Sequence, residues 1–136
     1  MDYRDLNVRR AAADEISAVH ALGRDTFTEE SQCTPGAFWP DVRQLETVLA
    51  IGGGIYIASH GSADIGFIAV EPSGQVAWLR AAAAHIGLVC AVCTAHAYAD
   101  IGSCWGPVGN ADVRAAAVAA ADGHLVDDSG VLRYVP

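Results

Sequence analysis

The feature that most constrains the fold is an apolar segment that follows a predicted strand near the middle of the chain. The strand spans about residues 75–81, and a helix is predicted over about residues 85–99. This helix is apolar on nearly every side, which predicts burial against more than one layer of structure. A membrane span needs about 20 apolar residues with few or no charges, whereas Arg80, His85 and His96 interrupt this stretch. We therefore expect the central helix of a soluble protein.

Composition and charge indicate a single packed domain and argue against some kinds of partner. The chain has 136 residues, of which 52% are hydrophobic and 18% are charged, so we expect a single domain over residues 1–136 with a packed core. The formal net charge is −8, and all eight basic residues are arginine. An acidic chain repels phosphate backbones, which argues against nucleic acid as a partner. The charged segment Met1–Asp5 lacks the apolar stretch of a signal peptide, so we expect a cytoplasmic protein with no membrane partner.

Hydrophobic periodicity and turn residues predict the other elements. Helices are expected over residues 12–28, 41–50 and 111–122, and a loop rich in Pro and Gly is expected over residues 31–40. Asp41 is expected to cap the second helix, and Gly52–Gly54 is expected to end it. Strands are expected over residues 7–10, 55–58, 65–70, 75–81 and 103–108, and a hairpin over residues 125–135. The order β-α-α-β-β-β-α-β-α-β-β predicts an α/β (α+β) fold. We expect a mixed, mostly antiparallel central sheet with helices on both faces.

Three stretches carry a family resemblance. Val8–Ile16 forms the predicted first strand and helix, Ile55–Val70 the second and third strands, and Trp105–Asn110 the fifth strand and an Asn before the last helix. In this order and spacing they resemble the GNAT-type N-acetyltransferase family, and the resemblance covers nearly the whole chain. It implies a GNAT-like fold and, as an expectation, acetyl transfer from acyl-CoA.

The resemblance also implies where acyl-CoA would bind. In the family, an Arg/Gln-x-x-Gly-x-Gly/Ala loop and a helix N-terminus aim backbone N–H groups at the acyl-CoA pyrophosphate. This chain departs from the motif, because Arg80–Gly87 has one glycine, at its far end, and alanine does not take a positive φ cheaply. If acyl-CoA is bound, the matching residues are Leu79, Ala81, Ala84, His85, Ile86, Gly87 and Asn110.

The acid–base residues of the family are missing from the matching positions. Many members carry a Tyr in the fourth helix that protonates the leaving thiolate, and here that stretch is Ala115–Ala121. The strand Val76–Leu79 offers no base, and Glu71 lies in a turn. General acid–base catalysis contributes about 10²–10⁴-fold. We therefore assign no catalytic residue and leave enzyme activity open.

Two functions follow from these departures. The first is a GNAT-like domain without a cofactor that has lost efficient acetyl transfer and acts as a binding or structural module, through a protein partner or self-association in an oligomer or larger assembly. Analogy at the level of the fold extends this hypothesis to a phage-encoded or virion-associated protein. The alternative is an acyl-CoA-dependent N-acetyltransferase that binds acetyl-CoA with a degenerate pyrophosphate loop.

The cysteines allow a second kind of site. Cys90 and Cys93 form a C-x-x-C, His96 follows three residues later, and Cys104 lies on the next predicted strand. This pattern is compatible with a zinc site or a redox pair. However, small apolar cysteines also pack well in a central helix, and a redox C-x-x-C normally opens a helix. We favour packing and assign no metal ligand.

Overall fold

A computed structural model of the protein describes residues 2–26 and 41–136. The loop predicted over residues 31–40, the last two residues of the first predicted helix, and Cys33 lie outside these ranges. The elements in chain order are η1 (Tyr3–Asp5), β1 (Leu6–Arg10), η2 (Ala13–Glu15), α1 (Ile16–Asp25), α2 (Val42–Ala50), β2 (Gly54–His60), β3 (Ala63–Val70), β4 (Val76–Ala81), α3 (Ile86–Ile101), β5 (Trp105–Pro107), α4 (Ala111–Ala120), β6 (Leu125–Asp128) and β7 (Val131–Tyr134). The predicted order of helices and strands is confirmed.

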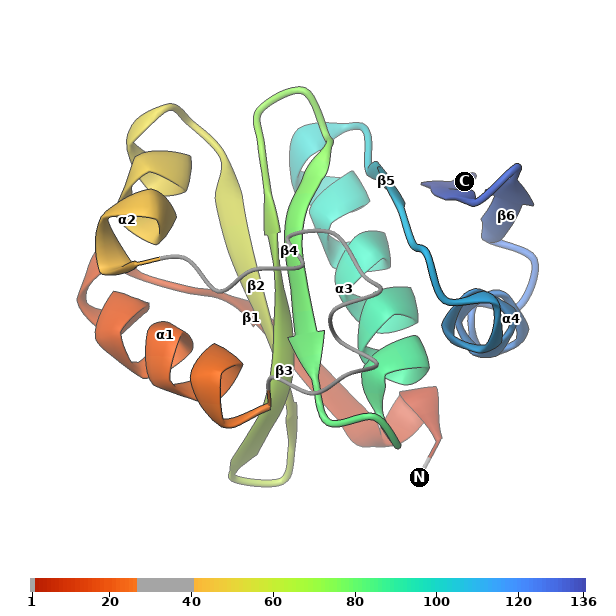
Figure 1. Ribbon diagram of the computed structural model, residues 1–136, viewed down its shortest axis with the longest axis horizontal. Coiled ribbons are helices and arrows are strands. Elements are labelled where there is room, and N and C mark those ends of the chain that lie inside the picture. Colours follow the sequence, from red (N-terminus) through yellow and green to blue (C-terminus); the bar gives the residue numbers. More distant parts are fainter. Residues whose placement is uncertain (1, 27–40) are drawn as a thin grey trace.

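The larger sheet is antiparallel and separates two apolar cores. Its four strands are in the order β1-β2-β3-β4. Figure 1 shows α1 and α2 on one face of this sheet and α3 on the other. Alternate residues of β2, β3 and β4 enter the two cores, so that Trp78 packs on the side of α1 and α2 while Leu79 packs on the side of α3.

The central helix α3 is enclosed by structure on more than one side. It contacts β2 and β3 of the larger sheet, and it also contacts α4 and β7. Figure 1 shows it between the larger sheet and the C-terminal part of the chain. Its buried residues are Ile86, Gly87, Val89, Cys90, Ala91, Val92, Cys93, Thr94 and Ala97. This position explains why the helix has no polar face, as the sequence predicts.

The C-terminal strands form a separate sheet in the order β5-β7-β6. A single parallel bridge, between Gln75 and Trp105, connects the two sheets within the described ranges. The N–H of Trp105 donates to the carbonyl oxygen of Gly74 at 2.9 Å, beside this bridge. Strand β5 then ends at Pro107, which has no N–H to donate to a neighbouring strand. The strands are therefore divided into two sheets between β4 and β5.

Local signals fix both ends of α2. The Asp41 carboxylate accepts from the N–H of Gln44 at 3.1 Å, and the Gln44 side chain accepts from the N–H of Asp41 at 3.0 Å. These two bonds form a capping box. At the other end Gly52 has a φ of +95°, and the N–H of Gly53 donates to the carbonyl oxygen of Val48 at 2.8 Å. This is a Schellman motif, so the glycines end the helix as predicted.

Arg9 joins three segments at the surface. Its guanidinium donates to Asp64 at 2.9 Å and to Glu15 at 3.0 Å, which ties β1 to β3 and to η2. The hydrogen bond from Arg9 lowers the pKa of Asp64, and the N–H of Ala12, followed by Arg9, lowers the pKa of Glu15. Groups with lowered pKa values stabilise the fold above their unfolded pKa and lose that contribution as pH falls through the folded value.

We therefore expect Arg9→Gln to lower Tm at neutral pH and to have a smaller effect in acid. The difference from wild type should shrink as pH falls below the ordinary pKa values of these carboxyls, 3.8 for Asp64 and 4.5 for Glu15. Thermal melts across this pH range would measure it. Arg43→Gln on exposed α2 is the matched control, and an Arg9→Gln deficit that persisted unchanged in acid would contradict the expectation.

Candidate functional site

A cavity of about 460 Å³ opens at the N-terminus of α3. One wall is the turn after β4 and the first turn of α3, and the other is the start and one side of α4. The lining residues are Ala83, Ala84, His85, Ile86, Gly87, Leu88, Asn110, Asp112, Val113, Ala116 and Ala120. The volume is within the range of small-molecule sites.

The first turn of α3 supplies hydrogen-bond donors to this cavity. The N–H of His85 donates to Ala82 and the N–H of Val89 donates to His85, at 2.8 Å and 2.9 Å. The N–H groups of Ile86, Gly87 and Leu88 have no acceptor among the described residues. Free N–H groups and the positive end of the helix dipole favour an anion at this point.

The side chains around the cavity include groups that favour charges of opposite sign. His85 lines it and can carry a positive charge, but the carboxylate of Asp112 lines it as well. Arg80, which the sequence places near the junction, is fully buried in β4 opposite Phe67, on the side of α1 and α2. Burial lowers the pKa of Arg80 to about 10, so it stays protonated at neutral pH. Its guanidinium donates to the Leu79 carbonyl oxygen at 2.8 Å rather than lining the cavity.

The residues that the sequence matched to an acyl-CoA site divide into two groups. Ala84, His85, Ile86, Gly87 and Asn110 meet at the cavity. Leu79 and Ala81 are buried in β4 on the α3 side, in the core between the sheet and α3.

Asn110 has a structural role in the described fold. Its side-chain oxygen accepts from the N–H groups of Asp112 and Val113, at 2.9 Å and 3.1 Å. These bonds make Asn110 the N-cap of α4. The oxygen is thus already engaged, and the cap holds the start of α4 beside the cavity.

The alanine run of α4 allows two helices to cross closely. A Cβ atom on Gly87 would lie 2.6 Å from the Cβ of Ala116, and Ala117 is fully buried. Contact at this distance tolerates no larger side chain without movement of a helix. Packing against α3 therefore explains the small residues Ala116 and Ala117 within the stretch Ala115–Ala121, which replaces the acid position of the family.

The interior between β4 and β5 is nearly filled beyond the Gln75–Trp105 bridge. A cavity of about 10 Å³ remains there, lined by Ile68, Val76, Leu79, Cys90, Thr94, Gly106, Val108 and Leu132. This is at the lower limit for one water molecule. The one hydroxyl among these side chains, that of Thr94, donates within α3 to the carbonyl oxygen of Cys90 at 2.7 Å. The space is small and apolar, and it has no room for an acyl chain.

A β-bulge in β4 is a feature that the sequence analysis missed. Ala69 pairs with Trp78 and Val70 with Val76, which leaves Ala77 as an extra residue between the two pairs. A bulge breaks the ladder locally, and bulges are frequent beside active sites. No glycine marks this one, so only the pairing with β3 reveals it.

The cysteine cluster forms no metal site in the described part of the chain. Within residues 2–26 and 41–136, no three His, Cys, Asp or Glu side chains are grouped as metal ligands. Cys90, Cys93 and Cys104 are buried free thiols, and burial raises the pKa of Cys90 and of Cys104 to about 12. His96 lies instead against the ring of Tyr56, with 5.5 Å between ring centroids. The thiols are therefore held in their protonated, unreactive form.

Comparisons with known proteins support the fold. No protein-family model and no curated protein matches the sequence. A GCN5-related N-acetyltransferase from Rhodopseudomonas palustris superimposes with a TM-score of 0.58 at 13% identity, over 96% of this chain and 95% of that one. An acetyltransferase from Thermus thermophilus gives a TM-score of 0.56 at 17% identity, over 100% and 99%. The chain has a GNAT-type fold.

A third neighbour agrees with this assignment. Apo-form YjaB from Escherichia coli has a TM-score of 0.51 at 17% identity, over 96% of this chain and 97% of that one. Identities this low establish the GNAT-type fold alone, and the fold class predicted from the sequence is confirmed.

Among the described residues, no helix combines the length and apolar character needed to cross a membrane.

Proposed function

We propose that this protein is a GNAT-like domain that has lost efficient acetyl transfer and acts as a binding module. The observation that carries the proposal is the small apolar space between β4 and β5, where about 10 Å³ remains. An acyl group placed between these strands would require them to separate. The cavity at α3 fits a pyrophosphate group in size and in its free N–H groups, but a phosphate bound there does not by itself provide a place for the acyl group.

The environment of α4 supports the same proposal. Ala117 is fully buried against α3, so a side chain that donates a proton could not replace it without moving a helix. Asp112 adds a negative charge to the wall of the cavity at α3, which weakens its attraction for phosphate. Within the described ranges, Asp112 and His85 are the titratable groups that line this cavity.

The alternative is an acyl-CoA-dependent N-acetyltransferase, and two observations favour it. The cavity at α3 brings together the free N–H groups of the helix with His85. The bulge at Ala77 interrupts the pairing of β4 with β3, and bulges are frequent beside active sites. This alternative requires that β4 and β5 separate when acetyl-CoA binds.

Titration with acetyl-CoA separates the two functions. We expect no heat of binding and no rise in Tm with millimolar acetyl-CoA. Micromolar binding would contradict the proposal, because a ligand at 100 times its Kd stabilises a protein by about 2.7 kcal/mol. Asp112→Asn is an informative partner variant, since removing this carboxylate should strengthen any binding of inorganic pyrophosphate at α3.

The binding role itself predicts association with another protein or with a second copy. Light scattering after size-exclusion chromatography would give the mass of the purified protein. A mass above that of the 14.1 kDa chain supports self-association, and a monomer directs attention to a separate partner.

A further inference from the structure

We propose that the outer face of the C-terminal sheet binds a second copy of this chain through a contact with twofold symmetry. This face is formed by the outward side chains of β5, β7 and β6, which are Trp105, Pro107, Val131, Arg133, Val126 and Asp128. The inference rests on the proposed binding role, and it gives that role a surface and a partner.

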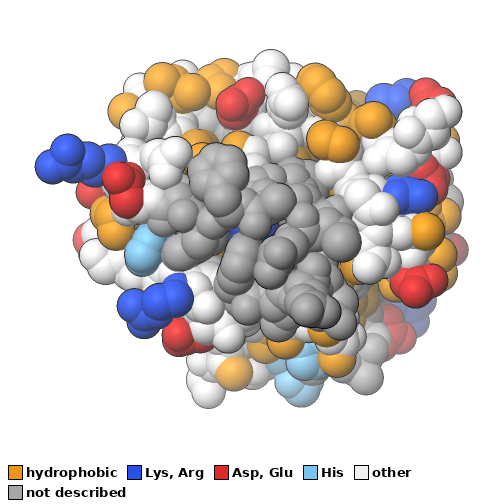
Figure 2. Space-filling model, viewed as in Figure 1, with side chains coloured by type: hydrophobic (Ala, Val, Ile, Leu, Met, Phe, Trp, Pro, Cys, Tyr) orange, Lys and Arg blue, Asp and Glu red, His pale blue; other side chains and the backbone are white. Residues whose placement is uncertain are grey.

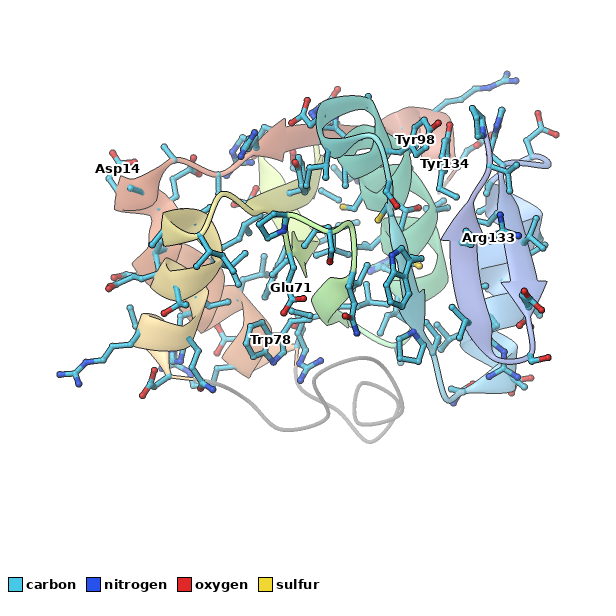
Figure 3. All side chains as sticks on the ribbon, turned by 90° about the horizontal axis from the view of Figure 1, so that it is seen from above. Asp14, Glu71, Trp78, Tyr98, Arg133 and Tyr134 are labelled. Carbon is cyan, nitrogen blue, oxygen red and sulfur yellow. The ribbon has the colours of Figure 1, made fainter. Side chains whose placement is uncertain are left out.

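Alternation along β6 and β7 decides which side chains point outward. Leu125 and Leu132 are buried in the core that contains α3. Successive side chains of a strand point to opposite faces, so Val126 and Arg133, which pair with each other, point away from this core. Val126 is 40% exposed, and Arg133 is exposed as well. Figure 3 shows Arg133 on this sheet, at the opposite end of the molecule from Asp14.

Arg133 and Asp128 give the outer face one charge of each sign. Within residues 2–26 and 41–136, neither side chain forms an ion pair. The other four residues of the face are uncharged, so the face is neutral in a chain with a net charge of −8. Figure 2 shows basic, acidic and hydrophobic side chains gathered at the upper right, where Figure 1 places β6 and the C-terminus. A neutral face allows two acidic copies to approach with little repulsion.

The arrangement of these charges is self-complementary. Arg133 lies opposite Val126, and Asp128 lies opposite Val131, so the four side chains form a square with Arg133 and Asp128 on one diagonal. The sides of this square are about 4.8 Å between strands and about 6.7 Å along a strand. A twofold axis along the Val126–Val131 diagonal places Arg133 of each copy over Asp128 of the other. Two ion pairs then flank an apolar centre, which is why we assign the face to a second copy and not to a different protein.

Strand β5 extends the apolar part of the face. Trp105 pairs with Arg133, and Pro107 pairs with Val131. Trp105 and Val131 are half-buried, yet neither belongs to the two cores of the described chain. Aromatic side chains are enriched in protein interfaces. Because the face is small, we expect a weak dimer.

The test measures the mass of the whole protein by sedimentation equilibrium, at concentrations up to about 1 mM because small interfaces form weak complexes. We expect the wild type to approach twice the mass of the 14.1 kDa chain. Arg133→Asp and Asp128→Arg should each weaken the dimer by about tenfold or more, because each replaces two ion pairs with two contacts between like charges. An equimolar mixture of the two variants should regain the dimer, since both contacts of the mixed dimer are again ion pairs.

Two variants far from this face are matched controls. Arg43→Asp on α2 and Asp14→Arg on η2 change the net charge by the same amounts at exposed positions, and both should keep the dimer. Circular dichroism would verify that every variant is folded.

Three results would overturn the proposal. The wild type could stay monomeric at the highest concentration, the control variants could dissociate as fully as the face variants, or the mixture of face variants could stay monomeric. Binding of acetyl-CoA would instead overturn the loss of acetyl transfer, and it would leave these masses unchanged.

Discussion

Leu79→Ala is expected to lower the free energy of unfolding by about 2–5 kcal/mol, the range for truncating a buried leucine. Leu79 is 1% exposed and packs between the larger sheet and α3, where it lines the small interior cavity beside β5. Truncation would enlarge this cavity, because close-packed strands and helices relax only partly. Thermal or urea unfolding would measure the loss, with roughly 3–6 °C of Tm for each kcal/mol.

The control for this prediction is a truncation at the surface. Val126 is 40% exposed on β6, so Val126→Ala should change stability by less than about 0.5 kcal/mol. If Leu79→Ala were as mild as Val126→Ala, the interior between β4 and β5 would have to be looser than described. That result would favour the acyl-CoA-dependent alternative, for which the two strands must separate.

Gly53→Ala is expected to destabilise the protein by about 3 kcal/mol, at the upper end of the usual cost of overpacking. A Cβ on Gly53 would overlap the carbonyl oxygen of Val70 and lie 2.8 Å from that of Val48. Both neighbours are backbone atoms, so either β3 or the end of α2 must move. Equilibrium unfolding in urea would measure the change.

A substitution at the adjacent glycine distinguishes the cost of this close contact from the cost of a left-handed backbone conformation. Gly52 has a φ of +95°, but its nearest neighbour to an added Cβ is a side-chain atom of Pro72 at 3.9 Å. Gly52→Ala should therefore cost about 1 kcal/mol, for the left-handed conformation alone. Equal effects at both positions would show that close approach is not what requires Gly53.

The elements that follow from local signals could be predicted from the sequence. Asp41 caps α2 as expected, although the sequence analysis did not name Gln44, which completes the capping box. Gly52 and Gly53 end α2 as expected. The apolar helix α3 is enclosed as its pattern predicts, because a helix without a polar face must be covered on several sides.

Features that depend on contacts between distant segments could not be predicted. The division between β4 and β5 and the bulge at Ala77 arise from strand pairing. A motif match could not show that Arg80 lies on the far side of β4, because one residue of strand register decides the face.

The enclosure of α3 has a consequence for synthesis of the chain. When residue 102 has been made, the larger sheet can cover one side of this helix, but α4 and β5–β7 are still missing. An apolar surface of α3 therefore faces water until the C-terminal part of the fold has packed against it. Opening of α4 and β5–β7 in the finished protein would uncover the same surface, so we expect partial unfolding at the C-terminal end to promote aggregation.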